Sequence, residues 1–258
     1  MKIDAAQIED ALARHAKAAL FLSGGKDSMA MLFLMEPWWK QLTVVWFNTG
    51  DAPEDTVALM AQVARSVPNF LELKGDVDQV IATYGIPVDL LTPEMEPQYG
   101  PLIASDKDTG IKFQSRMQCC ARTVWGPWLE QLNALGFTLL IRGQKLDDQL
   151  RPKTVSGQVD GNLELLFPLE HWTDFDVLTY LGENHLPYLQ EHYRYGNGSI
   201  DCCTCTAYLD EFHRLAFLQE KHPEKLPVYR ARLQAVADAT APVLFGLTRE
   251  LEVLTHGA

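Results

Sequence analysis

The stretch from residue 19 to residue 35 limits the folds open to this chain more than any other part of the sequence. An apolar run of strand type ends at a glycine loop, and an apolar run of helical type follows directly; the loop reads Ser23-Gly24-Gly25-Lys26-Asp27-Ser28. Glycines let a backbone approach an anion, and the N–H groups and positive dipole end of the following helix can hold it. The spacing differs from the Walker A loop. The stretch therefore predicts a phosphate cradle of another kind, with Lys26 as its charge.

Further strands and helices alternate along the chain. Strands are predicted at 42–47, 70–73, 137–141 and 164–169, and helices at 3–17, 53–65, 77–84, 125–135, 173–184, 211–221 and 229–239. Residues 86–117 are rich in proline, glycine and polar residues and are predicted to form a long active-site loop. The alternation predicts an α/β fold: a doubly wound, mostly parallel sheet with C-terminal helices. Ligands bind such sheets at the carboxyl ends of the strands.

The length of 258 residues allows one large or two small domains, and we favour a single nucleotide-binding domain. We expect it to span residues 1–210, with residues 211–258 as a C-terminal helical extension of the same domain. The hydrophobic content of 47% supports a sizeable core, and the net charge of -12 argues against broad nucleic-acid binding. No run approaches the ~20 apolar residues of a membrane span, and residues 1–14 lack the apolar region of a signal peptide. These features predict a soluble, cytoplasmic protein with no membrane partner.

Two more polar turns follow predicted strands. Asn48-Thr49-Gly50 carries short polar side chains that can bind a base or a ribose, although such a turn can also simply open a helix. The stretch from Arg142-Gly143 to Arg151 carries two arginines that can grip phosphate or sulfate with two hydrogen bonds each, although a solvated charged loop has the same composition. By itself the first turn is better interpreted as a helix entry, whereas anion binding is favoured for the second.

The five cysteines fall in two tight groups. Cys119 and Cys120 are adjacent, and Cys202, Cys203 and Cys205 follow about 80 residues later. An odd count in two clusters does not suit a disulfide framework in an intracellular chain. Four of these thiolates suit either zinc or an iron–sulfur cluster. The seven histidines show no metal spacing and are expected at the surface or as capping residues; His192 lies nearest the cysteines.

The glycine loop resembles the pyrophosphatase loop of the adenine nucleotide α-hydrolase-like ATP pyrophosphatases, a group that includes the PAPS reductase family. Residues 47–56 resemble the family's Asp-Thr-Gly…Pro-Glu-Thr stretch, with Asn48 in place of the usual Asp, and residues 141–151 resemble its arginine segment. Residues 167–188 resemble its Pro-Leu…Trp…Asp-Val…Tyr segment and are expected to be packing residues. The resemblance implies a Rossmann-like fold and ATP, APS or PAPS as the bound adenine nucleotide, with Mg²⁺ contacted by Asp27.

The resemblance also implies site residues. It places the nucleotide on Ser23, Gly24, Gly25, Lys26, Asp27, Ser28, Asn48, Thr49, Gly50, Arg142 and Gly143. It gives catalytic roles to Lys26, Asp27, Arg142 and Arg151. The cysteine pattern is similar to that of assimilatory APS reductases, which implies a 4Fe–4S cluster on Cys119, Cys120, Cys202 and Cys205, with Cys203 as a spare thiol.

One family feature is missing. Sulfonucleotide reductases carry a C-terminal cysteine that attacks sulfur, whereas no cysteine follows Cys205 here. The glycine loop is also complete, and reductases tend to carry degraded versions of it. We therefore expect an ATP pyrophosphatase-type transferase that passes AMP to an unidentified sulfur or AMP acceptor, with a sulfur or electron donor protein as a further partner. The alternatives are a sulfonucleotide reductase that uses Cys203 or a partner's thiol, and a non-catalytic nucleotide-binding protein with structural zinc.

Overall fold

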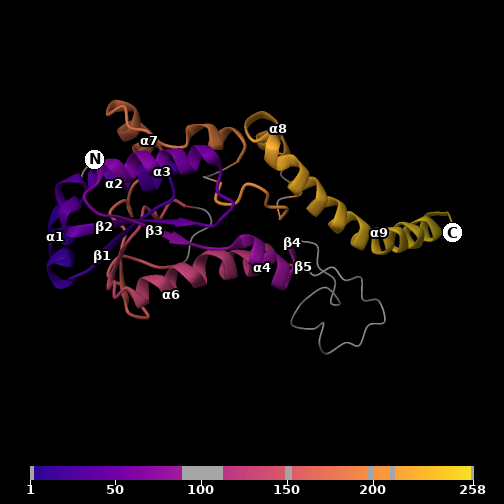
Figure 1. Cartoon of the computed structure of the whole chain (residues 1–258), viewed down its shortest axis with the longest axis horizontal. Coiled ribbons are helices and arrows are strands. Elements are labelled where there is room, and N and C mark those ends of the chain that lie inside the picture. Colours follow the sequence, from indigo (N-terminus) through magenta and orange to yellow (C-terminus); the bar gives the residue numbers. More distant parts are fainter. Residues whose placement is uncertain are drawn as a thin grey trace. The chain divides into compact units, whose positions relative to one another are not determined.

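A computed structural model describes residues 3–88, 113–148, 153–196, 200–207, 209 and 213–256 (Figure 1). The chain forms two compact units. The first consists of Met1–Asp76 and Thr123–Cys202, and the second of Val77–Arg122 and Cys203–Ala258. The boundary expected at residue 210 stays a prediction.

The first unit is built on a six-stranded sheet. Its strands are β1 (Ala18–Leu22), β2 (Leu42–Asn48), β3 (Phe70–Lys74), β6 (Leu139–Ile141), β7 (Val159–Asp160) and β8 (Leu163–Leu166), in the spatial order β3-β2-β1-β6-β8-β7. Every neighbouring pair is parallel except β7 and β8. In the centre, Leu20 pairs with Val44 on one side and Ile141 on the other. The predicted α/β class with a mostly parallel sheet is confirmed.

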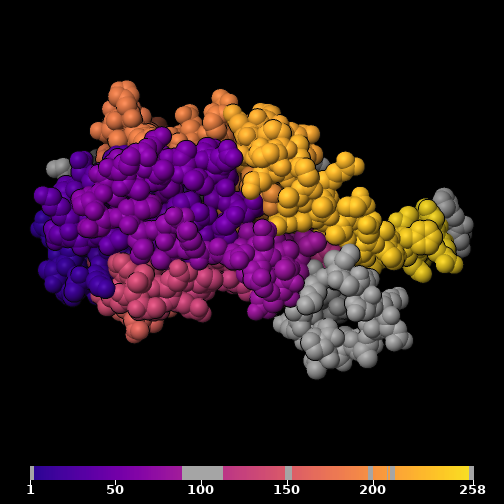
Figure 2. Space-filling model, viewed as in Figure 1, coloured from indigo at the N-terminus to yellow at the C-terminus, as the bar shows by residue number. Residues whose placement is uncertain are grey.

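Helices cover both faces of this sheet, as Figure 1 shows. Side chains alternate along a strand, so neighbouring residues enter different cores. Leu20 and Leu22 pack with α1 (Ala5–Arg14), α2 (Lys26–Leu34), α3 (Glu54–Ser66) and α7 (Asp174–Glu183). Ala19 packs on the opposite face, against α6 (Gly126–Ala134). The N-terminal third of the chain, in indigo and purple, makes up most of the visible surface of this unit in the space-filling view (Figure 2).

Local sequence signals set several helix ends. The side chain of Asp4 accepts a hydrogen bond from the N–H of Gln7 and so caps α1. Thr173 and Asp176 form a capping box at the start of α7. Two 3₁₀ segments, Glu36–Gln41 and Gln190–Arg194, complete the first unit and were not predicted.

The second unit is mainly helical. It contains α4 (Val77–Tyr84), a two-stranded parallel sheet of β4 (Ile86–Pro87) and β5 (Phe113–Gln114), α5 (Arg116–Cys120), α8 (His213–Lys221), a 3₁₀ turn (Pro223–Lys225) and α9 (Leu226–His256). The prediction of one long loop over 86–117 was therefore wrong at its two ends; residues 89–112 lie outside the described part.

The last helix is longer than its sequence pattern predicted. We expected it to end at residue 239, but α9 continues across Pro242 to His256. A proline inside a helix removes one N–H donor and crowds the preceding turn, and the helix accommodates both here. None of the helices in the described ranges combines the length and the apolar run that a membrane span needs.

Candidate functional site

The strand order reverses beside β1, which makes β1 and β6 the switch point of the sheet. The chain moves from β1 outward to β2 and β3 on one side, then returns to place β6 on the other side of β1. The chain thus continues from β1 and from β6 toward opposite sides of the sheet, and in open α/β sheets such a switch point is where ligands bind. Residues 23–28 follow β1, residues 142–143 follow β6, and residues 48–50 end and follow β2. The structure thus brings the described parts of all three predicted nucleotide elements to one edge of the sheet.

The glycine loop has the backbone shape that its sequence predicted. Gly24 has a φ of 81°, and its carbonyl accepts a hydrogen bond from the N–H of Leu189 at 3.0 Å. A Cβ atom at Gly24 would lie 2.8 Å from Cδ1 of Leu189, so no larger residue fits without a shift. Ser28 donates its hydroxyl proton to the Gly25 carbonyl at 3.0 Å and accepts from the N–H of Ser23 at 3.2 Å. These bonds hold the loop closed above the start of α2.

The helix that follows the loop begins without a side-chain cap of its own. Gly25 is the N-cap residue and carries no side chain that could bond the first-turn N–H groups. The N–H of Lys26 instead donates to the hydroxyl of Tyr193 at 2.9 Å. Burial raises the pKa of Tyr193, although the hydrogen bond from Lys26 opposes that effect, so the hydroxyl is neutral at ordinary pH. No sequence pattern pointed to Tyr193, which reaches the loop from the 3₁₀ segment at residues 190–194.

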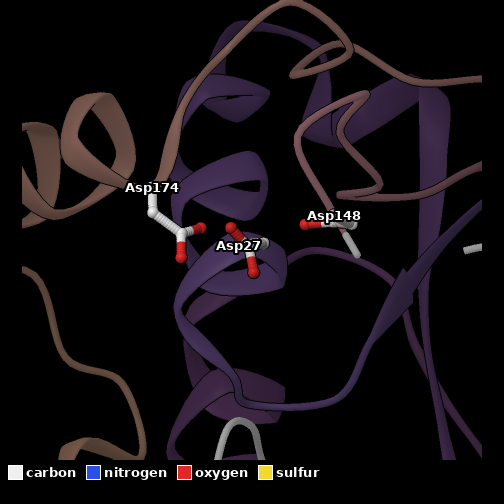
Figure 3. Close-up of side chains that lie close together, drawn as sticks. All are labelled: Asp27, Asp148 and Asp174. Atoms are coloured by element: carbon white, nitrogen blue, oxygen red, sulfur yellow. The ribbon is translucent and has the colours of Figure 1, made fainter. Parts of the chain in front are cut away.

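Three carboxylates meet at the same end of α2. Asp27, Asp148 and Asp174 each offer an oxygen atom, and these atoms lie within 4.8 Å of one another. Figure 3 shows Asp148 and Asp174 pointing toward Asp27 from either side. Lys26 bonds two of them, with Nζ 2.9 Å from Oδ2 of Asp27 and 2.8 Å from Oδ1 of Asp174. Lys26, the lysine of the glycine loop, is therefore held by carboxylates in this structure.

A second lysine lies among the same carboxylates. Lys145 is fully buried, and its Nζ lies 2.7 Å from Oδ1 of Asp27, 2.6 Å from Oδ1 of Asp148 and 3.1 Å from Oδ1 of Asp174. Burial lowers the pKa of Lys145, but its hydrogen bonds to Asp148 and Asp27 outweigh burial, so that its pKa is raised. Burial also lowers the pKa of Lys26, but its hydrogen bonds to Asp174 and Asp27 outweigh burial, so that the pKa of Lys26 is raised. Both ammonium groups are therefore charged, and three negative and two positive charges share this site.

The loop after β6 packs directly on the glycine loop. A Cβ atom at Gly143 would lie 2.8 Å from the backbone carbon and oxygen of Asp27 and 3.0 Å from the nitrogen of Ser28. Arg142 is half-buried beside it, and its N–H donates to the Leu166 carbonyl at 3.0 Å. Burial lowers the pKa of Arg142, with Asp148 acting in the opposite direction. Arg151, the other predicted arginine, lies outside the described residues.

The turn after β2 is held by its own side chains. Asn48 accepts through Oδ1 from the N–H of Gly50 at 3.0 Å and donates through Nδ2 to Glu72 at 2.8 Å. Gly50 has a φ of 89°, a conformation that favours glycine. Thr49 is buried, and its hydroxyl donates to the Asp201 carbonyl at 2.9 Å. The predicted nucleotide contacts of Asn48, Thr49 and Gly50 stay predictions.

The five cysteines offer thiol groups that could bind a metal or a cluster. Cys119 and Cys203 are buried, whereas Cys120, Cys202 and Cys205 are half-buried. Cys202 is the last residue of the first unit, and the other four belong to the second. The pair at 119–120 ends α5, which starts with a capping box and passes into a single π-helical turn at Ala121–Trp125. A set of four thiols fits a 4Fe–4S cluster or zinc, and the choice of Cys119, Cys120, Cys202 and Cys205 stays a prediction.

Several site residues were missed by the sequence patterns. Lys145 and Asp148 lie in the charged stretch for which anion binding was predicted, but no local pattern pairs Lys145 with Asp27. Asp174 lies in the segment expected to serve only packing, yet its carboxylate bonds Lys26 and Lys145. The expectation of surface or capping histidines was wrong for His192, which is fully buried.

Residues 17–208 match the family model for the phosphoadenosine phosphosulfate reductase domain. Adenosine 5'-phosphosulfate reductase 2 of Bacillus subtilis (strain 168) is 26% identical over 193 residues, which cover 71% of this chain and 70% of that protein. A phosphoadenylyl-sulfate reductase from Candida auris in a phosphate complex is 14% identical, with 74% and 85% of the two chains covered and a TM-score of 0.47. The U34-tRNA thiolase NcsA from Methanococcus maripaludis, with its [4Fe-4S] cluster, is 15% identical, with 84% and 70% covered and a TM-score of 0.42.

Proposed function

The chain belongs to the phosphoadenosine phosphosulfate reductase domain family, and on this basis we propose that it is an enzyme that binds ATP, transfers AMP to an acceptor and releases pyrophosphate in the course of sulfur transfer. One observation carries the choice of ATP: a complete glycine loop stands at the switch point of the sheet, with two lysines and three carboxylates at its helix end. Lysines suit the β- and γ-phosphates, and carboxylates suit the Mg²⁺ that accompanies them.

The proposed reaction needs charge stabilisation more than acid–base chemistry. A nucleophilic atom of the acceptor forms a bond to the α-phosphorus, the bond from that phosphorus to the bridging oxygen breaks, and pyrophosphate leaves with the electron pair. Lys26 would exchange its carboxylate partners for phosphate oxygens, and Arg142 would stabilise charge on the transferring group. Gly24 and Gly25 would let the loop N–H groups approach the leaving pyrophosphate. Asp27, with Asp148 and Asp174, would hold Mg²⁺, which neutralises phosphate charge when bound.

We propose that the cysteine set holds a 4Fe–4S cluster that serves the sulfur-transfer half of the reaction. Cys119, Cys120, Cys202 and Cys205 would be its ligands. The fit rests on donor chemistry, because thiolates are the usual ligands of such clusters. The acceptor, and a protein that donates sulfur or electrons, would complete the system.

Anaerobic binding measurements with ATP, APS and PAPS test the choice of nucleotide. We expect ATP to bind best in the presence of Mg²⁺, and Lys26→Ala to weaken it by about tenfold or more, because a charge-assisted hydrogen bond to phosphate is lost. Lys40→Ala is the matched control, since Lys40 is exposed on a 3₁₀ segment of the same unit. Preference for APS or PAPS over ATP would overturn the proposal.

A sulfonucleotide reductase is the second candidate, favoured by the similarity to adenosine 5'-phosphosulfate reductase 2 of Bacillus subtilis. Reduction needs a thiolate to attack sulfur. Cys203 is fully buried, which does not suit a nucleophile that must reach a substrate. Sulfite release from APS or PAPS would support this candidate, and its loss in Cys203→Ser would identify the nucleophile.

A further inference from the structure

The segment that leads into Cys202 is hydrogen-bonded to the first unit at two consecutive residues, near the edge of the sheet where we propose that the nucleotide binds. The N–H of Ile200 donates to Nδ1 of His192 at 3.1 Å, and the carbonyl of Asp201 accepts from the Thr49 hydroxyl at 2.9 Å. Both bonds engage main-chain groups, so they fix the path of the backbone directly before Cys202.

The His192 bond is itself held in place. A backbone N–H can only donate, so Nδ1 accepts and we assign the ring proton to Nε2. Nε2 then donates to Oδ2 of Asp55 at 2.9 Å. The other oxygen of Asp55 accepts from the N–H of Thr56 at 2.8 Å, in the first turn of α3. A fully buried imidazole therefore connects the start of α3 to the residue two positions before Cys202.

The hydrogen bond of Thr49 connects the residue directly before Cys202 to the turn after β2. A hydroxyl carries a single proton, and Thr49 gives this proton to Asp201 while accepting from the N–H of Asp51 at 3.3 Å. Because that proton is the only one available, a nucleotide oxygen that takes it removes the Thr49 donor from the Asp201 carbonyl.

We propose that Thr49, His192 and Asp55 are positioning residues for Cys202, and that Thr49 couples nucleotide binding in the turn after β2 to the exposure and reactivity of this thiol. The coupling rests on the proposed function, because it needs a nucleotide at this edge of the sheet. The positioning itself does not, since the hydrogen bonds exist in the chain alone.

The first test uses the full reduced chain, freed of metal by a chelator and kept anaerobic. Iodoacetamide alkylates the cysteines, and mass spectrometry follows each site separately. We expect Cys202 in Thr49→Val to react about fivefold faster than in the native chain, the effect of losing one hydrogen bond, and Thr49→Ser to resemble the native chain. Cys120 is the internal reference, because it is half-buried like Cys202. Equal Cys202 rates in Thr49→Val and Thr49→Ser would overturn the positioning role of Thr49.

Two His192 variants separate positioning from simple packing. His192→Asn keeps an acceptor near the place of Nδ1, whereas His192→Gln keeps a donor near the place of Nε2 and loses the bond from Ile200. We expect His192→Gln to raise the Cys202 rate more than His192→Asn does. Packing alone predicts the reverse, since asparagine leaves the larger cavity, and that order would overturn the role of His192.

ATP with Mg²⁺ provides the test of coupling, with binding measured in parallel by calorimetry. We expect saturating ATP to change the Cys202 rate by about threefold or more in the native chain and in Thr49→Ser, but not in Thr49→Val. Binding without any change in the native Cys202 rate would overturn the coupling and leave the proposed function standing. Absence of nucleotide binding would overturn the proposed function and the coupling with it, and the variants measured without nucleotide would still decide the positioning. A second measurement applies if the chain without metal does not stay folded. In that case a chelator is added to anaerobically purified Thr49→Val and Thr49→Ser, and the rate of metal loss is measured in place of alkylation. We expect faster metal loss from Thr49→Val, and equal rates would contradict the proposal.

Discussion

Lys145 places a buried positive charge between carboxylates that come from three different stretches of the first unit. Asp27 opens α2, Asp148 follows β6, and Asp174 opens α7. Because these carboxylates already bond Lys26 and Lys145, the site holds its charges in internal pairs. An anion alone would have to compete with carboxylates for the lysines. A metal–nucleotide complex can pair with the carboxylates and the lysines at once, because the cation binds the carboxylates while the phosphates bind the lysines. The site therefore favours ATP with Mg²⁺ over a free anion.

The pairing predicts the effect of removing the buried lysine. Lys145→Met keeps the side-chain volume but leaves Asp27 and Asp148 without this counter-charge, so we expect the free energy of unfolding to fall by about 2 kcal/mol. The value lies below that of a fully buried pair because the side chains of Asp27 and Asp148 are 25% and 29% exposed. Urea unfolding measures it, with the exposed Lys40→Met as control.

A second variant shows whether charge is the cause. Adding Asp148→Asn to Lys145→Met removes the carboxylate that Lys145 pairs with and Lys26 does not, and we expect it to restore part of the lost stability. If Lys145→Met is as stable as the native chain, or if the double variant is the less stable of the two, the lysine does not act as the counter-ion of these carboxylates.

At the scale of elements, the loops after β1 and β6 meet without space for a side chain between them. A Cβ at Gly143 would lie 2.8 Å from backbone atoms of Asp27, and backbone cannot turn aside as a flexible side chain does. The close approach brings the turn with Arg142 against the first turn of α2. The glycine therefore sets how closely these two loops approach each other at the edge of the sheet where we propose that the phosphates bind.

Gly143→Ala is expected to separate these two loops. We expect a loss of about 1–3 kcal/mol in unfolding free energy, the usual cost of forcing atoms into a packed site, together with weaker ATP binding. Gly182→Ala is the matched control: Gly182 lies in α7, a Cβ there meets nothing within 4 Å, and the change is expected to stabilise by about 0.5–1 kcal/mol. Unchanged ATP affinity in Gly143→Ala would show that this contact does not shape the site.

The same elements show what could be predicted from the sequence. The strand–loop–helix at residues 19–35 and the helix at 77–84 depend on neighbours in the chain, and both were found from local patterns. Asp174 and Tyr193 reach the phosphate loop from more than 140 residues away in sequence, through the packing of the fold. No local pattern encodes such contacts, so the network of charges around Lys26 could be recognised only in three dimensions.

At the scale of the whole molecule, the family match covers the sheet and both cysteine groups but ends before α9. It runs from residue 17 to residue 208, whereas α9 begins at Leu226. The three loops in which we propose nucleotide contacts thus lie in the part of the chain that defines the family, and so do the cysteines. A chain that keeps both parts is expected to use them together, which makes metal content the most informative property of the intact protein.

Metal analysis of anaerobically purified protein tests the cluster proposal. We expect about four irons and about four acid-labile sulfides per chain, because four thiolates hold one 4Fe–4S cluster. Cys202→Ser is expected to lose most of this iron, whereas Cys203→Ser is expected to keep it, since Cys203 is the spare thiol of the proposed set. The two variants are matched, because they make the same substitution at adjacent positions.

Zinc at about one per chain, with neither iron nor sulfide, would replace the cluster by a structural zinc site. Equal iron loss in both variants would show that the ligand set includes Cys203 and would require a new assignment of the four ligands.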